Sequence, residues 1–358
     1  MKMIKKILIT GNEAIAQGAL DAGCRFYAGY PITPQNELIG YMAKNMPLAS
    51  AIPPAHPAGI FIQAESEIAA INMVFGASAS GVRAMTSSSS PGISLKQEGI
   101  SYIAGAELPA VIVNIMRGGP GLGNINPSQA DYFQAVKGGG HGDYRLIVFA
   151  PGSAQEAYDL TRLSFELADK YRCPAMILGD GILGQMMEPV KFSIPQTRLP
   201  EKPWALTGCL GRKPNVAKSF YLREGDLEKS NLRLQKKYST IESKEQRWQE
   251  LFLDDAKIVI VAYGTLARVV KSAISRLRAK GKKVGLIRLI SLWPFPKKAF
   301  AAAAAKKRKY LVVEMSYGQM VEDARLAAAG RAEVDFLGRS GGGVPTEDEI
   351  IKKIMRIL

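Results

Sequence analysis

Two blocks of the sequence alternate short strand-like apolar runs with longer helix-like runs. The first block covers residues 1–190, and the second covers residues 256–358. Alternation of this kind is typical of α/β domains, in which helices connect the parallel strands of a sheet. We therefore expect a parallel-sheet α/β domain over 1–190 and a second, smaller α/β domain over 256–358.

The expected strands can be read directly from the apolar runs. They are RFYAGYP, GVRAMTS, PAVIVNIM, YRLIVFAP and CPAMILGD in the first block, and AKIVIVAYG, KVGLIRLI, YLVVEM and VDFLG in the second. Residues 191–255 interrupt the pattern with several prolines and a long charged run. We interpret them as a connecting arm that ends in one exposed helix.

Length and composition indicate the class of protein and its expected location. At 358 residues with 47% hydrophobic content, it has the length and balance of a soluble protein of about two domains. No stretch approaches the roughly 18 apolar residues of a membrane span, and the N-terminal run Ile7–Ile9 is too short for a signal peptide. The expected location is the cytoplasm, with no membrane partner.

The cysteines exclude one class of redox site. Cys24, Cys173 and Cys209 are far apart and form no CxxC pair. An iron–sulfur or zinc site built by this chain alone is therefore not expected. Any redox metal should belong to a partner.

Positive charge is concentrated in the second half. Residues 1–190 hold 13 Lys and Arg against 15 Asp and Glu, whereas residues 191–358 hold 34 against 17. A basic surface could meet nucleic acid, a phosphorylated cofactor or an acidic protein, or could simply be solvated. Because the basic runs carry no nucleic-acid motif and no interleaved aromatic residues, no nucleic-acid partner is expected.

In a parallel sheet, ligands bind beyond the carboxyl ends of the strands, so the residues after each strand are the candidates for a site. Thr33 follows the first of these strands and stands between Pro31 and Pro34. The two prolines stiffen the backbone around Thr33. Thr33 also suits the N-cap of a helix that begins with Pro34.

Two further strand ends lead into helices. Glu65 and Glu67 open a helix whose next residues, Ile68 to Ala79, are almost wholly apolar or small, so this helix is expected to be buried. A carboxylate at its start is either a surface cap or a buried functional group, and composition does not decide between them. The hydroxyl-rich run that includes Ser89 and Ser90 could offer backbone N–H groups to an anion, or be an ordinary capped turn.

A fourth strand end carries a cation. Arg117 directly follows the run PAVIVNIM and precedes a glycine-rich loop. A guanidinium there can hold a carboxylate or a phosphate through two parallel hydrogen bonds. The glycine spacing fits neither a dinucleotide fingerprint nor a P-loop. His141, farther along the loop, has no neighbouring nucleophile or ligand cluster, so a structural role is expected for it.

Several of these motifs together resemble one family. YPITPQ, QAESEIAAINMVFGASASG, TSSSSPG, VNIMRGGPGLG, QADYFQAVKGGGHGD and VEMSYGQMVEDARLA are similar to the alpha-type subunit of the 2-oxoacid:ferredoxin oxidoreductases. The resemblance runs through both α/β blocks and is weak only over 191–255. QMMEPV and FLGRSGGGVPTEDEI resemble most the branch that acts on 2-ketoisovalerate (3-methyl-2-oxobutanoate).

The resemblance implies a fold and a reaction. Residues 1–190 would be a pyrimidine-type thiamine-diphosphate-binding domain, and residues 256–358 a transketolase C-terminal-like domain. The family converts a 2-oxoacid, coenzyme A and oxidised ferredoxin into acyl-CoA, carbon dioxide and reduced ferredoxin. A beta-type partner would hold the diphosphate and Mg²⁺, and a gamma-type subunit and a ferredoxin-like subunit with [4Fe-4S] clusters would complete the complex.

The resemblance also assigns roles to residues. Glu67 would bind N1′ of the aminopyrimidine, with Glu65 as the second candidate. Arg117 would meet the substrate carboxylate, and Thr33 would lie close to the reacting thiazolium. Pro31, Ile32, Ser89 and Ser90 would line the cofactor.

Two alternatives remain open at this stage. One is the same reaction on 2-oxoglutarate or pyruvate. Because 2-oxoglutarate needs a second cation, Lys96 and Lys137 would matter, but the sequence does not say which of them faces inward. The other alternative is a non-catalytic assembly subunit, against which the joint presence of Thr33, Glu67 and Arg117 argues.

Overall fold

The computed structural model describes residues 6–48, 58–193, 199–304 and 308–358. Its largest sheet has seven strands in the order β12-β6-β7-β5-β4-β2-β3. All neighbouring strands in it are parallel except β12, which pairs with β6 in the antiparallel sense. The strands are β2 (Phe26–Gly29), β3 (Ile60–Gln63), β4 (Ala84–Ser88), β5 (Val111–Met116), β6 (Ile147–Phe149), β7 (Ala175–Asp180) and β12 (Ser291–Trp293).

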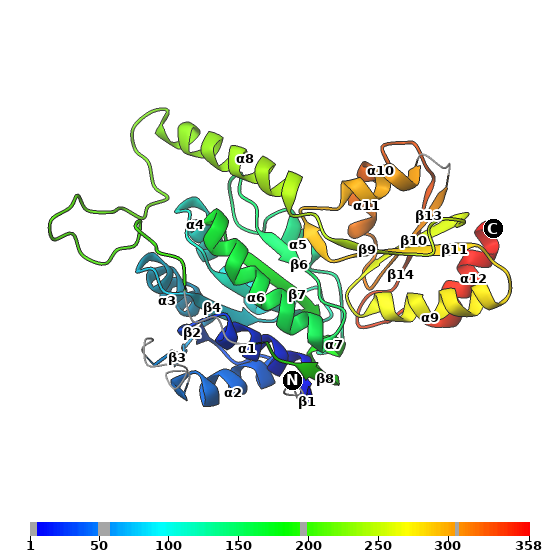
Figure 1. Ribbon diagram of the computed structural model, residues 1–358, viewed down its shortest axis with the longest axis horizontal. Coiled ribbons are helices and arrows are strands. Elements are labelled where there is room, and N and C mark those ends of the chain that lie inside the picture. Colours follow the sequence, from blue (N-terminus) through cyan, green and yellow to red (C-terminus); the bar gives the residue numbers. More distant parts are fainter. Residues whose placement is uncertain (1–5, 49–57, 194–198, 305–307) are drawn as a thin grey trace, which may run out of the picture.

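Helices cover both faces of this sheet (Figure 1). On one face α1 (Gly11–Asp21) packs between α2 (Asn36–Asn45) and α6 (Ala154–Tyr171). On the other face α3 (Glu67–Ala79) packs against α4 (Ser90–Gly105). This division follows from right-handed crossovers, because the chain moves along the sheet in one direction through α3 and α4 and in the opposite direction through α6.

A second sheet of five strands, in the order β14-β13-β10-β11-β9, forms the C-terminal part of the molecule. Its strands are β9 (Trp248–Leu251), β10 (Ile258–Tyr263), β11 (Val284–Leu289), β13 (Lys309–Glu314) and β14 (Val334–Gly338). The helices beside it are α9 (Leu266–Ala279), α10 (Lys297–Ala304), α11 (Met320–Ala328) and α12 (Glu347–Ile357). The prediction of an α/β fold with parallel sheets is confirmed, and every strand expected in the two blocks is present.

Short elements that the alternation did not predict tie the molecule together. β1 (Lys6–Thr10) and β8 (Met187–Lys191) form a separate antiparallel pair, and α5 (Tyr132–Val136) and α7 (Gly181–Gln185) follow strand ends of the first sheet. β12 lies within the expected second domain but joins the first sheet, while β9 lies within the expected arm but joins the second sheet. The borders at residues 190 and 255 stay predictions.

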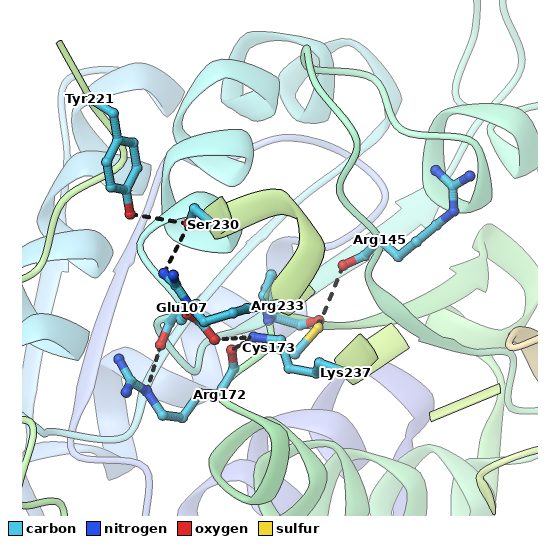
Figure 2. A network of polar contacts seen from close by, with 9 residues as sticks. Glu107, Arg145, Arg172, Cys173, Tyr221, Ser230, Arg233 and Lys237 are labelled. Atoms are coloured by element: carbon cyan, nitrogen blue, oxygen red, sulfur yellow. Dashed lines mark hydrogen bonds and ion pairs between the residues drawn. The ribbon is translucent and has the colours of Figure 1, made fainter. Parts of the chain in front are cut away.

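The arm ends in α8 (Asp226–Lys244), which is exposed along one face and docked along the other. Its buried residues Leu234, Tyr238 and Ile241 continue the hydrophobic core. Lys237 donates hydrogen bonds to the Glu107 carboxylate (2.8 Å) and to the Arg172 carbonyl (2.9 Å). Figure 2 shows this network at the point where α8 meets the first domain.

Polar contacts also join the two sheets. The Gln129 side chain is fully buried, donates to the Tyr263 carbonyl (3.1 Å) and accepts from the Met315 N–H (3.0 Å). Asp180, the last residue of β7, accepts a hydrogen bond from the Thr265 hydroxyl at 2.5 Å. Because both side chains are buried, the loss of either bond would leave an unsatisfied polar group, so these contacts fix one sheet relative to the other.

The expectation that α3 is buried on all sides is wrong. Ile68 is half exposed, and Asn72 and Gly76 on the same outer face are also exposed. The helix packs mainly against α4, β2 and β4, so it buries one side, which includes Ala70, Ile71 and Val74. None of the helices in the described parts of the chain is long and apolar enough to cross a membrane.

Candidate functional site

The candidate residues gather where the order of the first sheet changes direction. From β2 the chain goes to β3 on one side, and from β3 it returns across β2 to β4 on the other. The loops after β2 and β4 therefore diverge at the carboxyl edge and leave room between them, which is where open α/β sheets bind ligands. The loop after β3, with Glu67 at its end, and Arg117 after β5 flank the same edge.

Glu67 is the first residue of α3, and it is almost fully buried, at 6% exposed. Ser66 caps the helix, because its hydroxyl accepts the Ala69 N–H at 3.1 Å, and this cap turns the following side chain inward. Glu65, two residues earlier, is exposed. Within the described parts of the chain no group donates a hydrogen bond to the Glu67 carboxylate, which leaves it as a buried acceptor ready for a ligand.

Two side-chain oxygens lie close above the backbone of Gly92, in the first turn of α4. A Cβ atom on Gly92 would stand 2.1 Å from the Ser88 hydroxyl oxygen and 2.5 Å from Glu67 Oε1. The Ser88 hydroxyl and the Glu67 carboxylate therefore converge on one place. The hydroxyls of Ser88 and Ser89 are buried and have no hydrogen-bond partner among the described residues.

Gly92→Ala should disturb this convergence. Because the added methyl group would force the Ser88 and Glu67 side chains apart, we expect a loss of about 1–3 kcal/mol in the free energy of unfolding and weaker thiamine diphosphate binding. Thermal melting and calorimetric titration measure the two effects. Gly76→Ala on α3 is the matched control, since a Cβ there meets nothing within 4 Å; equal losses in both variants would contradict the prediction.

Thr33 does not cap a helix, so that expectation is wrong. Helix α2 begins at Asn36, its N-cap is Gln35, and no side chain caps it. The reason is the fully buried Gln35 side chain, which accepts a 2.5 Å hydrogen bond from the Ser87 hydroxyl and so delays the start of the helix. The Thr33 hydroxyl instead accepts from the Asn36 side chain at 3.2 Å.

The turn around Thr33 is nevertheless held from three sides. Asn12 donates to the Pro34 carbonyl at 2.9 Å, Arg117 donates to the Thr33 carbonyl at 3.0 Å, and Gln35 is fixed by Ser87. Ile32 is half-buried and Pro31 is exposed. The turn is therefore a rigid part of the site, although its rigidity comes from these contacts as well as from the prolines.

Arg117 is buried at the end of β5. Its Nη1 atom donates to the Thr33 carbonyl and its Nη2 atom donates to the Leu122 carbonyl, both at 3.0 Å. Its Nε atom is buried without a partner among the described residues. Since a guanidinium has five N–H donors, three remain for an anion.

The Ser90 hydroxyl, unlike those of Ser88 and Ser89, has hydrogen-bond partners within the chain. Its hydroxyl donates to Asp131 at 2.6 Å and accepts the Arg117 N–H at 3.0 Å, while its own N–H donates to the Asn114 side chain at 3.1 Å. Burial raises the pKa of Asp131, and its bonds to Ser90 and Asn114 act in the opposite direction. These bonds join the ends of β4 and β5, so Ser90 supports Arg117. Its contact with a cofactor stays a prediction.

The two candidate lysines are now placed. Lys137 pairs with Asp323 of α11, in the C-terminal part of the molecule. Lys96 is fully buried; its ammonium donates to the Thr86 hydroxyl at 3.0 Å and to the Glu67 carbonyl at 3.4 Å. No local sequence pattern singles out Ser88, Gln35 or Gly92, because their importance depends on contacts between distant segments.

The chemistry of the Glu67, Ser88 and Ser89 side chains suits the aminopyrimidine end of thiamine diphosphate. A heteroaromatic ring with nitrogen donors and acceptors can bind to a carboxylate and hydroxyls. Glu67 supplies a buried carboxylate, and the buried hydroxyls of Ser88 and Ser89 have no hydrogen-bond partner among the described residues. The fit is to this end only. Among the described residues no group of three or more His, Cys, Asp or Glu side chains is placed to hold a metal ion.

Comparisons with known proteins agree with this fit. Residues 17–203 match the family model described as "Pyruvate flavodoxin/ferredoxin oxidoreductase, thiamine diP-bdg", and residues 256–350 match "Pyruvate:ferredoxin oxidoreductase core domain II". Ketoisovalerate oxidoreductase subunit VorB of Methanothermobacter marburgensis is 50% identical over 98% of this chain and 97% of its own length. The 2-oxoglutarate synthase subunit KorA of Methanothermobacter thermautotrophicus is 37% identical over 99% of this chain and 100% of its own length.

A solved structure gives the same result for the fold. The 2-oxoglutarate:ferredoxin oxidoreductase of Magnetococcus marinus, with 2-oxoglutarate, coenzyme A and succinyl-CoA bound, superposes with a TM-score of 0.87 at 26% identity. The match covers 99% of this chain and 66% of that longer chain. The chain therefore belongs to the 2-oxoacid:ferredoxin oxidoreductase family, as an alpha-type subunit with a thiamine-diphosphate-binding domain.

Proposed function

We propose that this chain is the alpha-type subunit of a complex that oxidatively decarboxylates 3-methyl-2-oxobutanoate with coenzyme A and reduces ferredoxin. The observation that carries the proposal is the close approach of the Glu67 carboxylate and the Ser88 hydroxyl above Gly92, in a segment that is bonded to Arg117 through Ser90. Such a constellation has the donor set of a cofactor-binding subunit, whereas a subunit kept only for assembly would not need a buried carboxylate without a partner.

Thiamine diphosphate, when bound, supplies the carbanion chemistry by which a 2-oxoacid loses carbon dioxide. Glu67 would share one proton with N1′ through a hydrogen bond, with Ser89 and the turn Pro31–Thr33 along the ring. Arg117 would bind the carboxylate of the oxoacid through its free donors. Because Arg117 is bonded to the Thr33 carbonyl, the substrate cation and the Thr33 hydroxyl would be positioned by one rigid unit.

The preference for a branched-chain oxoacid has two supports. The identity to a ketoisovalerate subunit, 50%, exceeds that to a 2-oxoglutarate synthase subunit, 37%. The second carboxylate of 2-oxoglutarate would also need a second cation. In the described parts of the chain, Lys137 is engaged with Asp323, and Lys96 lies beneath Glu67.

The remaining parts of the reaction need partner chains. A beta-type subunit would hold the diphosphate and Mg²⁺, and a gamma-type subunit and a ferredoxin-like subunit with [4Fe-4S] clusters would carry electrons to ferredoxin. Coenzyme A would be the acyl acceptor. The cysteines are consistent with this division, since Cys24 and Cys173 are buried and far apart in the sequence.

The test is the relative turnover of three oxoacids by the complex purified anaerobically from its own host. We expect viologen reduction with 3-methyl-2-oxobutanoate to exceed that with 2-oxoglutarate or pyruvate by about tenfold or more in kcat/KM. A subunit suited to a branched side chain would lose apolar contacts with the methyl group of pyruvate, and it would leave the second carboxylate of 2-oxoglutarate without a cation. Equal rates would remove the branched-chain preference. A pure, fully assembled complex without activity on any of the three would favour the assembly role.

A further inference from the structure

Lys96 is a buried charge that the proposed function does not use. Its side chain extends from α4 to the space beneath the first turn of α3 and is 0% exposed. Burying an ammonium group is costly unless a partner compensates for it, so such a group is retained where it acts on a neighbour.

The neighbours of the ammonium group are few. β4 contributes the uncharged Thr86 hydroxyl at 3.0 Å, and α3 contributes the Glu67 carbonyl at 3.4 Å. Glu67 is also the charged side chain whose field acts on Lys96 among the described residues. Lys96 is thus bonded to the residue whose carboxylate lies close to Gly92 and the Ser88 hydroxyl.

We propose that Lys96 is a positioning residue for Glu67: its ammonium group, anchored by Thr86, holds the backbone at the start of α3 and thereby the direction of the Glu67 carboxylate. The nature of the group that this carboxylate binds rests on the proposed function, but the coupling between Lys96 and Glu67 does not. In this proposal Lys96 acts through Glu67, because its ammonium group contacts the Glu67 carbonyl and the Thr86 hydroxyl and does not contact the cofactor or the substrate.

The attraction between Lys96 and Glu67 should depend on pH. Burial lowers the pKa of Lys96 to about 7, although the Glu67 carboxylate acts in the opposite direction. The positive charge is therefore present below neutral pH and lost as the pH rises above it. The attraction to Glu67 should follow the same course.

The first experiment is a double-mutant cycle with Lys96→Met and Glu67→Gln, measured as melting temperatures of the assembled complex after removal of thiamine diphosphate. At about pH 6, where the ammonium is charged, we expect Glu67→Gln to lower the melting temperature more in the wild type than in Lys96→Met. At about pH 9 the two shifts should be equal, because Lys96 is then neutral. Additive shifts at both pH values would overturn the proposal, because a purely structural lysine has no pH-dependent coupling.

Two further variants keep the test decisive. Thr86→Val removes the anchoring hydroxyl while keeping the ammonium group, and it should reduce the coupling at about pH 6. Lys137→Met, a lysine paired with Asp323, should leave the Glu67→Gln shift unchanged at both pH values. If Lys96→Met does not assemble, the Glu67→Gln shift at about pH 6 is compared between the wild type and Thr86→Val instead, and equal shifts in these two backgrounds would overturn the proposal.

A second readout separates this proposal from the proposed function. Calorimetric titration of the cofactor-free complex with thiamine diphosphate should give a Kd about tenfold higher in Lys96→Met, the usual scale for loss of a supporting partner at a buried site. In the Glu67→Gln background, Lys96→Met should add no further loss. One further outcome is a melting-temperature coupling without a change of Kd in either variant. In that case the interaction between Lys96 and Glu67 is supported, and the assignment of Glu67 to cofactor binding is wrong.

Discussion

Glu67→Gln is expected to lower oxoacid-dependent viologen reduction by about 10²- to 10⁴-fold, the contribution typical of a side chain that holds a proton during the reaction. The substitution keeps the size of the side chain and removes its negative charge. Glu67 is 6% exposed and its carboxylate accepts no hydrogen bond within the described parts of the chain, so its structural contribution there is limited to the attraction to Lys96. The complex should therefore assemble normally, as size-exclusion chromatography would show.

Glu65→Gln is the matched control, since the same chemical change is made two residues away on an exposed side chain. We expect its rate to stay within about twofold of the wild type, because surface substitutions away from a site have small effects. Full activity of Glu67→Gln would refute the assignment. Loss of activity in Glu65→Gln alone would transfer the role to Glu65.

Arg117→Met should lower kcat/KM for the oxoacid by about 10²- to 10³-fold, since it removes a charge-assisted bidentate contact worth several kcal/mol. Two effects should combine. The oxoacid loses its cation, which raises KM, and the Thr33 carbonyl loses a hydrogen bond that fixes the turn, which lowers kcat. Steady-state kinetics with 3-methyl-2-oxobutanoate separate the two.

Arg268→Met provides the comparison, because Arg268 is half exposed and pairs with Glu188 at the surface. Its kinetics should match those of the wild type. A variant of Arg117 with unchanged KM would show that the oxoacid carboxylate binds elsewhere. In that case Arg117 would serve only to join the Thr33 turn to the glycine-rich loop through Leu122.

The fold could be predicted from the sequence because its strands are central and apolar. The runs around Val111–Met116 and Ile258–Tyr263 are buried along their whole length, so their composition alone identifies them. β12 could not be found in this way. It has three residues, and its partner β6 lies more than a hundred residues earlier, so no local pattern marks it.

The site was predictable in its residue types but not in its contacts. Glu65 and Glu67 are equivalent by composition, and the Ser66 cap places one outside and one inside. Thr33 looked like a helix cap, because Pro34 is a good first helical residue. The Ser87–Gln35 bond overrides that local preference from 52 residues away. Local propensity fails here since a tertiary contact determines where the helix begins.

The antiparallel pairing of β12 with β6 has a consequence for synthesis of the chain. During translation the first sheet can reach its full width only after Ser291–Trp293 have emerged from the ribosome, although its other six strands are complete by Asp180. Until then the edge of β6 offers unpaired backbone groups to other chains. Because β6 has only three residues, that exposed edge is short. Few backbone groups of the nascent chain are therefore available for wrong pairing with another chain.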